Sequence, residues 1–430
     1  MFQGIILLFE CLTKSATRTV EIQSRRLWIT MLFILTIAND APCAFLPEAE
    51  GLIFRITRIH EDPVRGSLRE WNTKDQVVVI SNEQGIVEIP FVEVLWLTPV
   101  GESEEWQTDH EGGWMILSNG DQFPFQLPIA DEVTLVARTQ RLGKLEIPLE
   151  MVRAMLLKRT RNEESRSSLI HRLSRLQKKE DVLLMSSGDS YAGTFLGIGS
   201  NYYRFEVAGN QVKLDRAEVL SLKMNPELLV TPQFSGLHAV ALLQDGSRLS
   251  LVPEQIQGGI LKGRTVFQKS VAFALSDLVK LQVMGGGVVY LSDLKPALYQ
   301  HTPFLSLPWM WCADQSVSGN SMRLRRRTMV KGIGMHSRSQ ITYTLDGTYR
   351  WLDGVVGIDD ETKGQGSVVF RVETDGKVRF NSGLLRGIDV PVKLGRIRIQ
   401  GARRLTLIVE FADRGDILDH ADWGDVRLVP

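Results

Sequence analysis

The chain is poor in cysteine, balanced in charge, and without a long apolar run after residue 47. Its three cysteines among 430 residues supply neither a disulfide framework nor a cysteine-based zinc site. Lys plus Arg and Asp plus Glu both number 50, so the formal net charge is zero, whereas a nucleic-acid-binding protein needs a basic excess to hold the phosphates. No segment from Pro47 onward is apolar over the roughly 20 residues that a membrane-spanning helix needs. We therefore expect no nucleic-acid partner and no membrane span in this part of the chain.

The overall composition is that of a globular protein with hydrophobic cores. Hydrophobic residues make up 43% of the chain and charged residues 23%, which is typical of globular domains. A chain of 430 residues has room for about two to four domains. The one dense basic run, Arg323–Thr328, is best interpreted as a solvated strand face.

The N-terminal segment has the order of a secretory signal. A basic pair, Arg25 and Arg26, precedes an apolar core over 27–38, and the small residues Ala41 and Ala44 follow. An apolar helix of that length rises about 18 Å, which is short of the roughly 30 Å of a hydrocarbon core. We predict that residues 1–46 are a signal or leader segment and that the protein is secreted, periplasmic or on the cell surface.

A repeated pattern occupies the next part of the chain. Apolar runs flank tight turns at Gly120, Gly188 and Gly246, and such turns need the positive φ that glycine adopts freely. A second segment begins about 27 residues after each turn and has apolar residues at its first, sixth and ninth positions. These segments start at Ile89 (an earlier copy with a degenerate turn), Ile147, Leu214 and Phe273. We predict two small β-barrel-like units over 47–160 and two more over 181–284, which resemble Sm-like or SH3-like barrels.

The insertion at 161–180 differs from the repeats. Leu169, Ile170, Leu173 and Leu176 recur at helical spacing among charged residues, so we expect an amphipathic helix that packs against a neighbouring unit or, less favourably, binds a partner. The repeats themselves carry no visible chemistry. Asp121 follows a turn glycine, and we assign it to turn geometry rather than to catalysis.

The last third, 285–430, alternates short strands with turn dipeptides. Asp346-Gly347 and Asp375-Gly376 each separate two alternating apolar runs, which predicts two hairpins. The density of strands and the absence of a helical period indicate an antiparallel β-sandwich or jelly roll. The predicted fold class is therefore all-β, with tandem barrel-like repeats followed by a sandwich.

Five motifs in the last third resemble those of the NPCBM domain, a carbohydrate-binding module. They are "YLSDLKP" (290–296), "KGIGMHS" (331–337), "VVGIDD" (355–360), "GSVVFRVETDGK" (366–377) and "DHADWGDVRL" (419–428). The resemblance implies a galactose-binding-like β-sandwich that binds glycan through loops at one end. It also implies a structural calcium ion in many members, for which Asp422 or Asp359 is the candidate ligand here. A solvated acidic loop is the alternative for these carboxylates.

The candidate sugar-binding residues follow from the chemistry of a sugar ring, which has C–H faces and hydroxyl edges. Such a ligand is held by an aromatic plane together with planar polar groups. The candidates are His336, Arg338, Trp351, Asp359 and Asp360, with Trp309 and Trp311 as a further platform. The alternative for His336 is a hydrogen bond to a backbone carbonyl that orders its glycine turn. A single histidine without other imidazoles nearby disfavours zinc. Trp423 and Tyr343 are expected in the core.

The function predicted from the sequence is that of an exported, non-catalytic protein that binds polysaccharide or a galactose-containing glycan. The alternative is a structural or protein-interaction surface protein that does not bind sugar and has cell-surface protein partners. A glycosidase is disfavoured because it needs two carboxylates in a large cleft, and units of this size seldom form one. If the glycan-binding interpretation is correct, Trp351→Ala is expected to weaken sugar binding.

Overall fold

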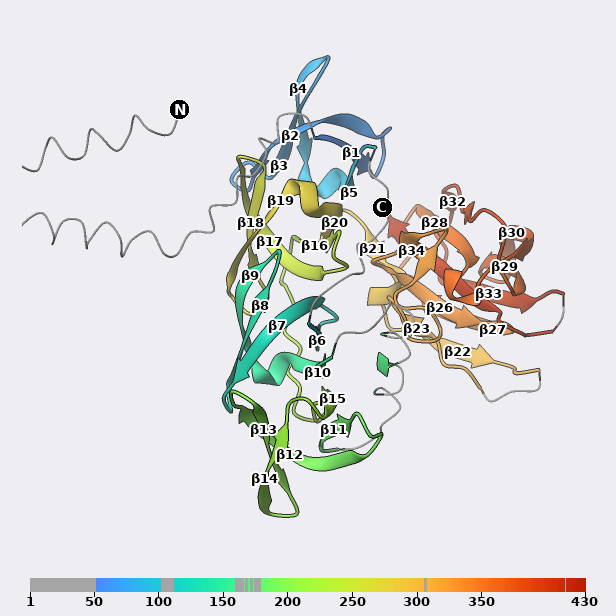
Figure 1. Cartoon of the computed structure of the whole chain (residues 1–430). Helices are drawn as coiled ribbons and strands as arrows, with labels where there is room; N and C mark the ends of the chain where they lie inside the picture. Colours follow the sequence, from blue (N-terminus) through green and yellow to red (C-terminus); the bar gives the residue numbers. More distant parts are fainter. Residues whose placement is uncertain are drawn as a thin grey trace, which may run out of the picture. The chain divides into compact units, whose positions relative to one another are not determined.

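The computed structural model describes residues 52–101, 112–158, 166, 169–170, 173, 179–304, 308–413 and 415–430. The predicted leader lies outside these residues. The chain is almost entirely β, as predicted (Figure 1). Over the described ranges, no helix combines the length and the apolar character needed to cross a bilayer.

The repeat region is built from one succession of strands used four times, in blue to yellow in Figure 1. Each copy has five strands, and in three copies a single 3-10 turn precedes the last strand. The first copy is β1 (Ile53–Arg58), β2 (Val64–Asn72), β3 (Val77–Asn82), β4 (Gly85–Pro90), η1 (Phe91–Glu93) and β5 (Val94–Pro99). The second is β6 (Gly113–Leu117), β7 (Gln122–Ala130), β8 (Thr134–Thr139), β9 (Gly143–Pro148), η2 (Leu149–Met151) and β10 (Val152–Leu156). The third is β11 (Asp181–Met185), β12 (Ser190–Ile198), β13 (Tyr202–Val207), β14 (Asn210–Asp215) and β15 (Val219–Lys223). The fourth is β16 (His238–Leu243), β17 (Arg248–Gln257), β18 (Ile260–Thr265), β19 (Ser270–Ala274), η3 (Leu275–Asp277) and β20 (Leu278–Met284).

The repeated apolar spacing has a structural cause. In the first copy Ile89 lies in the hairpin strand β4, whereas Val94 and Leu97 belong to β5 after the 3-10 turn, and all three side chains are buried. The 3-10 turn reverses the chain between them, so residues on both sides of the turn enter the same core. The closing strands also join the copies, because β5 pairs with β20 and β10 pairs with β15. All twenty strands therefore belong to one continuous sheet system.

The turn residue Asp121 does more than shape its turn. Gly120 adopts the positive φ expected of a tight turn, but the Asp121 side chain is fully buried. Its carboxylate accepts hydrogen bonds from the Ser250 backbone N–H (2.9 Å) and hydroxyl (2.7 Å) in the fourth copy. Burial raises the pKa of Asp121, and the Arg248 guanidinium opposes that shift. Asp121 thus connects the second and fourth copies.

Only part of the predicted insert lies within the described residues. Arg166, Leu169, Ile170 and Leu173 have helical conformation, and Leu173 is buried against Trp114 and Leu156 of the second copy. The Arg166 guanidinium lies 3.9 Å from the centroid of the Trp114 ring. At these positions the apolar stripe packs on a neighbouring unit.

The C-terminal strands form two antiparallel layers, in orange and red in Figure 1. The first layer contains β21 (Val289–Tyr290), β23 (Cys312–Ala313), β26 (Gly332–His336), β34 (His420–Val429), β28 (Trp351–Ile358), β31 (Val392–Lys393) and β32 (Ile397–Arg398). The second contains β22 (Leu298–His301), β27 (Ser339–Thr344), β33 (Arg404–Phe411), β29 (Ser367–Thr374) and β30 (Lys377–Arg386). Short elements between them are η4 (Leu291–Asp293), η5 (Asp360–Thr362) and the small hairpin of β24 (Arg323–Leu324) and β25 (Arg327–Thr328).

The sandwich core lies between the two layers. Trp423 of the first layer is fully buried and meets Phe370 of the second edge to face, with ring centroids 5.1 Å apart. Val368, Phe370 and Val372 line one face of β29, as the alternation predicts, and Tyr343 is also buried there. The core placement expected for Trp423 and Tyr343 is therefore what the structure shows.

One of the two predicted hairpins is wrong. β29 and β30 do pair across Asp375-Gly376. In contrast, β27 pairs with β22 and β33, and β28 pairs with β34, so Asp346-Gly347 connects the two layers. The turn dipeptide specifies a chain reversal, but burial of the apolar faces of both strands in a two-layer core decides that they lie in different sheets.

Candidate functional site

A cluster of histidines and one tryptophan lies at one end of the sandwich, where both layers contribute. His336 ends β26 and His420 begins β34, and the antiparallel register makes the two residues direct partners. His301 ends β22 in the other layer. Trp309 lies in the connection between β22 and β23.

The rings of this cluster are in mutual contact. The indole of Trp309 stacks on the imidazole of His336 at a centroid distance of 4.9 Å and an interplanar angle of 4°. His420 lies 5.7 Å from His336 and 5.5 Å from Trp309, and His301 meets His336 edge on at 5.8 Å. His336 and His420 are buried, whereas Trp309 is half-buried. Three imidazoles and an indole thus share one small region.

The backbone of Ser337 fixes two of the imidazoles. Its carbonyl oxygen lies 2.8 Å from His336 Nδ1 and 3.0 Å from His301 Nε2, and because a carbonyl can only accept, both nitrogens carry a hydrogen. Burial lowers the pKa of His336, and charge on His420 or His301 would lower it further. His336 is therefore held neutral, with its Nε2 lone pair free of any partner among the described residues.

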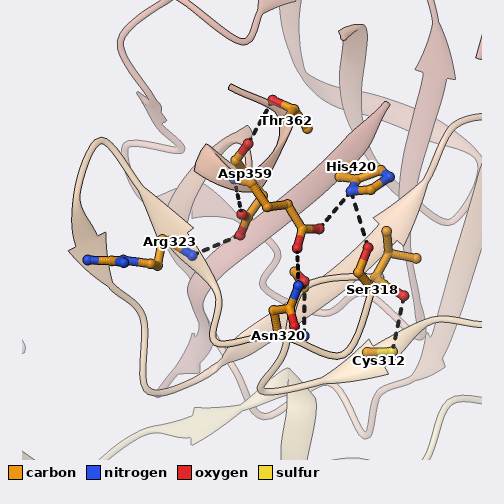
Figure 2. Close-up of polar contacts among 10 residues, drawn as sticks. Cys312, Ser318, Asn320, Arg323, Asp359, Thr362 and His420 are labelled. Carbon is orange, nitrogen blue, oxygen red and sulfur yellow. Dashed lines mark hydrogen bonds and ion pairs between the residues drawn. The ribbon is translucent and has the colours of Figure 1, made fainter. Parts of the chain in front are cut away.

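Glu361, together with Asn320 and Ser318, forms an acidic arm that orients His420 (Figure 2). His420 Nδ1 donates to Glu361 Oε1 at 2.6 Å, and Asn320 Nδ2 donates to Glu361 Oε2 at 2.7 Å. Ser318 Oγ lies 3.4 Å from the same His420 nitrogen. Burial raises the pKa of Glu361, but the hydrogen bonds from His420 and Asn320 outweigh it, so the net pKa is lowered. With Nδ1 committed to Glu361, His420 also presents Nε2 without a partner in the described part of the chain.

A buried carboxyl pair lies beneath the acidic arm. Asp359 accepts the backbone N–H groups of Arg323 and Glu361, both at 2.8 Å, and Figure 2 shows its contact with Arg323. Asp422 is fully buried, and neither carboxylate oxygen has a hydrogen-bond donor. Burial raises the pKa of Asp359 to about 6. Burial and the nearby negative charge of Asp359 raise the pKa of Asp422 well above its ordinary value.

The donor set at this pair does not fit calcium. Calcium takes six to eight oxygen ligands, and the two oxygens of Asp422 are the unpartnered ones at this point. The Asp359 carboxylate already accepts two backbone N–H groups. Over the residues that the structure describes, no group of three or more His, Cys, Asp or Glu side chains is arranged to hold a metal ion. A shared proton, rather than a cation, matches the carboxyl pair.

Comparison with known proteins identifies the module that carries this site. Residues 287–429 match the model of the NPCBM/NEW2 domain. They are an NPCBM domain. The sequence resemblance of the last third is thereby confirmed, and the match supports a carbohydrate-binding module.

Individual relatives are similar over limited parts. Alpha-1,3-galactosidase B of Akkermansia muciniphila is 33% identical over 116 residues, which is 26% of this chain and 14% of that protein. A solved structure of CBM51 from Clostridium perfringens GH95 in complex with methyl-galactose has 29% identity, covers 33% of this chain and 99% of that chain, and gives a TM-score of 0.30. A structure of CBM51-2 and INT domains from Clostridium perfringens ZmpB with GlcNAc has 26% identity, covers 40% and 36% of the two chains, and gives a TM-score of 0.31. The chain spans only a small share of the length of the curated galactosidase.

The structure brings some of the sequence-predicted residues together in the NPCBM domain. His336 lies at the centre of the cluster, and its hydrogen bond to a backbone carbonyl is the one foreseen as the alternative. Asp359 lies beneath the acidic arm, with its carboxylate engaged by backbone N–H groups. Asp360 accepts the backbone N–H groups of Arg325 (2.9 Å) and Arg326 (2.6 Å), so it shapes a turn of the basic run.

Two predicted residues have side-chain neighbours outside the cluster. Arg338 is exposed and has Glu410 as its charged neighbour at 3.9 Å. Trp351 begins β28, whereas Asp359 follows its end, so the two are separated by eight residues of extended chain, about 26 Å. Trp351 packs beside Leu95 and Val429 instead. Trp311, paired with Trp309 in the sequence interpretation, packs partly buried against the sandwich core.

Sequence reasoning missed His301, His420, Glu361, Asn320 and Ser318. The premise that His336 has no imidazole nearby was wrong, because two others lie within 6 Å. A usable signal existed: three of the chain's seven histidines fall in the last third, and each occurs beside a strand. Both nitrogens of His301 already have hydrogen-bond partners, so this imidazole offers no lone pair to a metal ion.

Proposed function

We propose that the NPCBM domain binds a carbohydrate at the cluster of Trp309, His336 and His420. The observation that carries this proposal is the pair of Nε2 atoms on His336 and His420. Each imidazole commits Nδ1 to a protein acceptor, which leaves two lone pairs without a partner among the described residues. Sugar hydroxyls donate to such lone pairs.

The aromatic ring beside them suits the other part of a sugar. Trp309 is half-buried, and one face of its indole is stacked on His336. A sugar ring has an apolar C–H face that packs on an aromatic plane while its hydroxyls reach polar groups. Asn320 and Glu361 lie beside His420 and add amide and carboxylate groups at the same end. Galactose-containing glycans are the first class to test, because one relative is named an alpha-1,3-galactosidase and one similar module is bound to methyl-galactose.

We propose that this binding is non-catalytic and that the protein is exported. A glycosidase needs two carboxylates about 5 to 9 Å apart with access to substrate. The carboxyl pair of this domain is buried, with Asp422 fully enclosed, so it is closed to a glycosidic bond. Export is supported by the order of charged, apolar and small residues in 25–44. The repeats would then space the module from its attachment point.

The proposal is tested by isothermal titration of the full chain with methyl-galactoside and with N-acetylglucosamine. Trp309→Ala is expected to weaken binding at least about tenfold, because stacking of a nucleic-acid base on an aromatic ring contributes on the order of 1–3 kcal/mol and we expect a similar contribution from the C–H face of a sugar. Trp351→Ala is the matched control and is expected to leave affinity unchanged, contrary to the expectation from sequence alone. Equal affinities for wild type and Trp309→Ala would show that the sugar binds at a site that does not include Trp309.

A glycan-array screen of the same protein separates the main proposal from its alternative. Retention on galactose-bearing or other polysaccharide glycans supports carbohydrate binding. No retention on any glycan, together with a stable cell-surface protein partner, would instead favour the structural or protein-interaction role.

A further inference from the structure

His301 differs from the other two histidines because both of its ring nitrogens have fixed partners. Nε2 lies 3.0 Å from the Ser337 carbonyl oxygen and therefore donates. Nδ1 accepts the backbone N–H of Trp309 at 3.1 Å. This arrangement admits one protonation state, the neutral imidazole with its hydrogen on Nε2.

A second proton would break one of these two bonds. It would have to enter at Nδ1, where the Trp309 N–H already points, and two N–H groups cannot share a hydrogen bond. Trp309 would keep the hydrogen bond that its carbonyl accepts from Tyr299 (2.8 Å) but would lose the one that its N–H donates. Imidazole is the side chain that ordinarily changes charge between pH 5 and 8. The position of Trp309 is therefore linked to the protonation of His301.

We propose that His301 is a positioning residue that holds Trp309 in place only while the His301 imidazole is neutral. Acidification therefore displaces Trp309 and releases the bound sugar. This inference rests on the proposed function, because it concerns the same site. It assigns to His301 a role that involves no contact with the sugar.

The charged and titratable neighbours of His301 act in both directions. The groups around His301 and Trp309 are Tyr299, His336, Arg338, Glu361, Asp416, Asp419 and His420. Positive charge on His336 or His420 would repel a second charged imidazole. Asp419 accepts the Ser337 hydroxyl at 2.6 Å, and burial raises its pKa to about 6, so its protonation would loosen Ser337 in the same pH range. Asp416 favours charge on His336 and accepts the Phe304 N–H at 3.2 Å.

Hydrogen exchange of the Trp309 amide tests the inference without any sugar. In the wild-type full chain, protection of this amide, corrected for the intrinsic pH dependence of exchange, is expected to fall at least about tenfold between pH 7.5 and pH 5.0, as for loss of one buried hydrogen bond. His301→Asn should keep the protection at both pH values, because the Asn side-chain oxygen can accept the Trp309 N–H but cannot be protonated. His238→Asn, in the repeat region, is the control and should respond like wild type.

Two outcomes of the hydrogen-exchange experiment would overturn the inference. One is wild-type protection that stays constant with pH, a result that needs no variant to fold. The other is an equal loss of protection in wild type and His301→Asn, and Asp419→Asn then shows whether Asp419 is the group responsible.

The pH dependence of sugar affinity is a second measurement, independent of hydrogen exchange. Methyl-galactoside affinity should weaken at least about tenfold from pH 7.5 to pH 5.0 in wild type and stay within about threefold in His301→Asn. Equal wild-type affinity at both pH values would overturn the inference and leave the proposed function standing. Failure to bind sugar at any pH would reject the proposed function, while the exchange result would still decide whether His301 positions Trp309.

Discussion

At the scale of single residues, burial and chemistry conflict most clearly at Asp422. Its side chain is fully buried near the start of β34, and neither carboxylate oxygen has a hydrogen-bond donor. Two carboxylates cannot hydrogen bond to each other, so Asp422 gains a partner only once it or Asp359 carries a proton. Burial raises the pKa of both acids, that of Asp359 to about 6, and the negative charge of Asp359 raises the pKa of Asp422 further. Above pH 3.8 the folded pair therefore holds more protons than the same acids hold in the unfolded chain.

This difference predicts that Asp422→Asn is stabilising near neutral pH. A raised folded-state pKa gives stability that is present below the unfolded value of 3.8 and lost as pH rises through the folded value. Asn has the shape of the protonated acid and donates to Asp359 without needing a proton. We expect the free energy of unfolding at pH 7 to rise by on the order of 2 kcal/mol, measured by urea unfolding at pH 5 and pH 7.

The same variant tests whether Asp422 is a calcium ligand. If Asp422 were a calcium ligand, added calcium would raise the melting temperature of wild type, and Asp422→Asn would abolish that rise and destabilise the protein at pH 7. We expect the melting temperature of wild type to be the same in calcium and in chelator.

At the scale of elements, the long bent strand of the third repeat depends on close backbone approach. In β12, residues 190–193 pair with β11, and residues from Thr194 onward pair with β13. Gly193 lies at the change of partner, where an added Cβ would meet the Glu206 carbonyl oxygen at 1.9 Å. Glycine is thus required by lack of space, because the strand must bend across its neighbour to close the unit.

We predict that Gly193→Ala destabilises the protein by roughly 2–4 kcal/mol, since the clashing atom is backbone and the strands must separate. Gly209 is the control: it has a φ of +79° with open space around its Cβ position, so Gly209→Ala should cost only about 1 kcal/mol. Thermal unfolding followed by circular dichroism measures both. Equal costs would mean that the bend at Gly193 relaxes without strain.

At the scale of the whole molecule, a buried polar network joins the last repeat to the NPCBM domain. Lys280 of β20 pairs with Asp425 of β34 at 3.1 Å, and both side chains are nearly enclosed. Gln282 donates to Asp425 at 3.0 Å and to the Tyr290 hydroxyl at 2.9 Å. The Lys280 ammonium also lies 4.6 Å from the centroid of the Trp96 ring. Removal of one charge would leave the other buried without compensation.

Asp425→Asn is therefore expected to cost about 3 kcal/mol or more, because Lys280 remains buried and charged. Asn keeps the acceptor for Gln282 and tolerates the positive φ of +48° at this position. Glu254→Gln, in an exposed pair with Arg264, is the control and should change stability by less than about 1 kcal/mol. Scanning calorimetry of the full chain compares the two variants; a small effect of Asp425→Asn would show that water reaches Lys280.

Features that depend on neighbouring residues were predictable from the amino-acid sequence. Alternation placed Val368, Phe370 and Val372 on a buried face, and the fixed spacing of Ile89, Val94 and Leu97 marked a recurring unit. The NPCBM motifs identified the C-terminal module. These signals are local because strand faces alternate with a period of two and tight turns need particular residues.

Which residues share a site depends on contacts between distant segments of the folded chain. His336 and His420 are 84 positions apart in sequence, and strand register alone makes them partners. Trp351 and Asp359 flank one strand, and its extended geometry keeps them at opposite ends. Pairing register and layer assignment are set by burial of apolar faces between distant segments. No local pattern contains that information, so the histidine cluster emerges only in the folded chain.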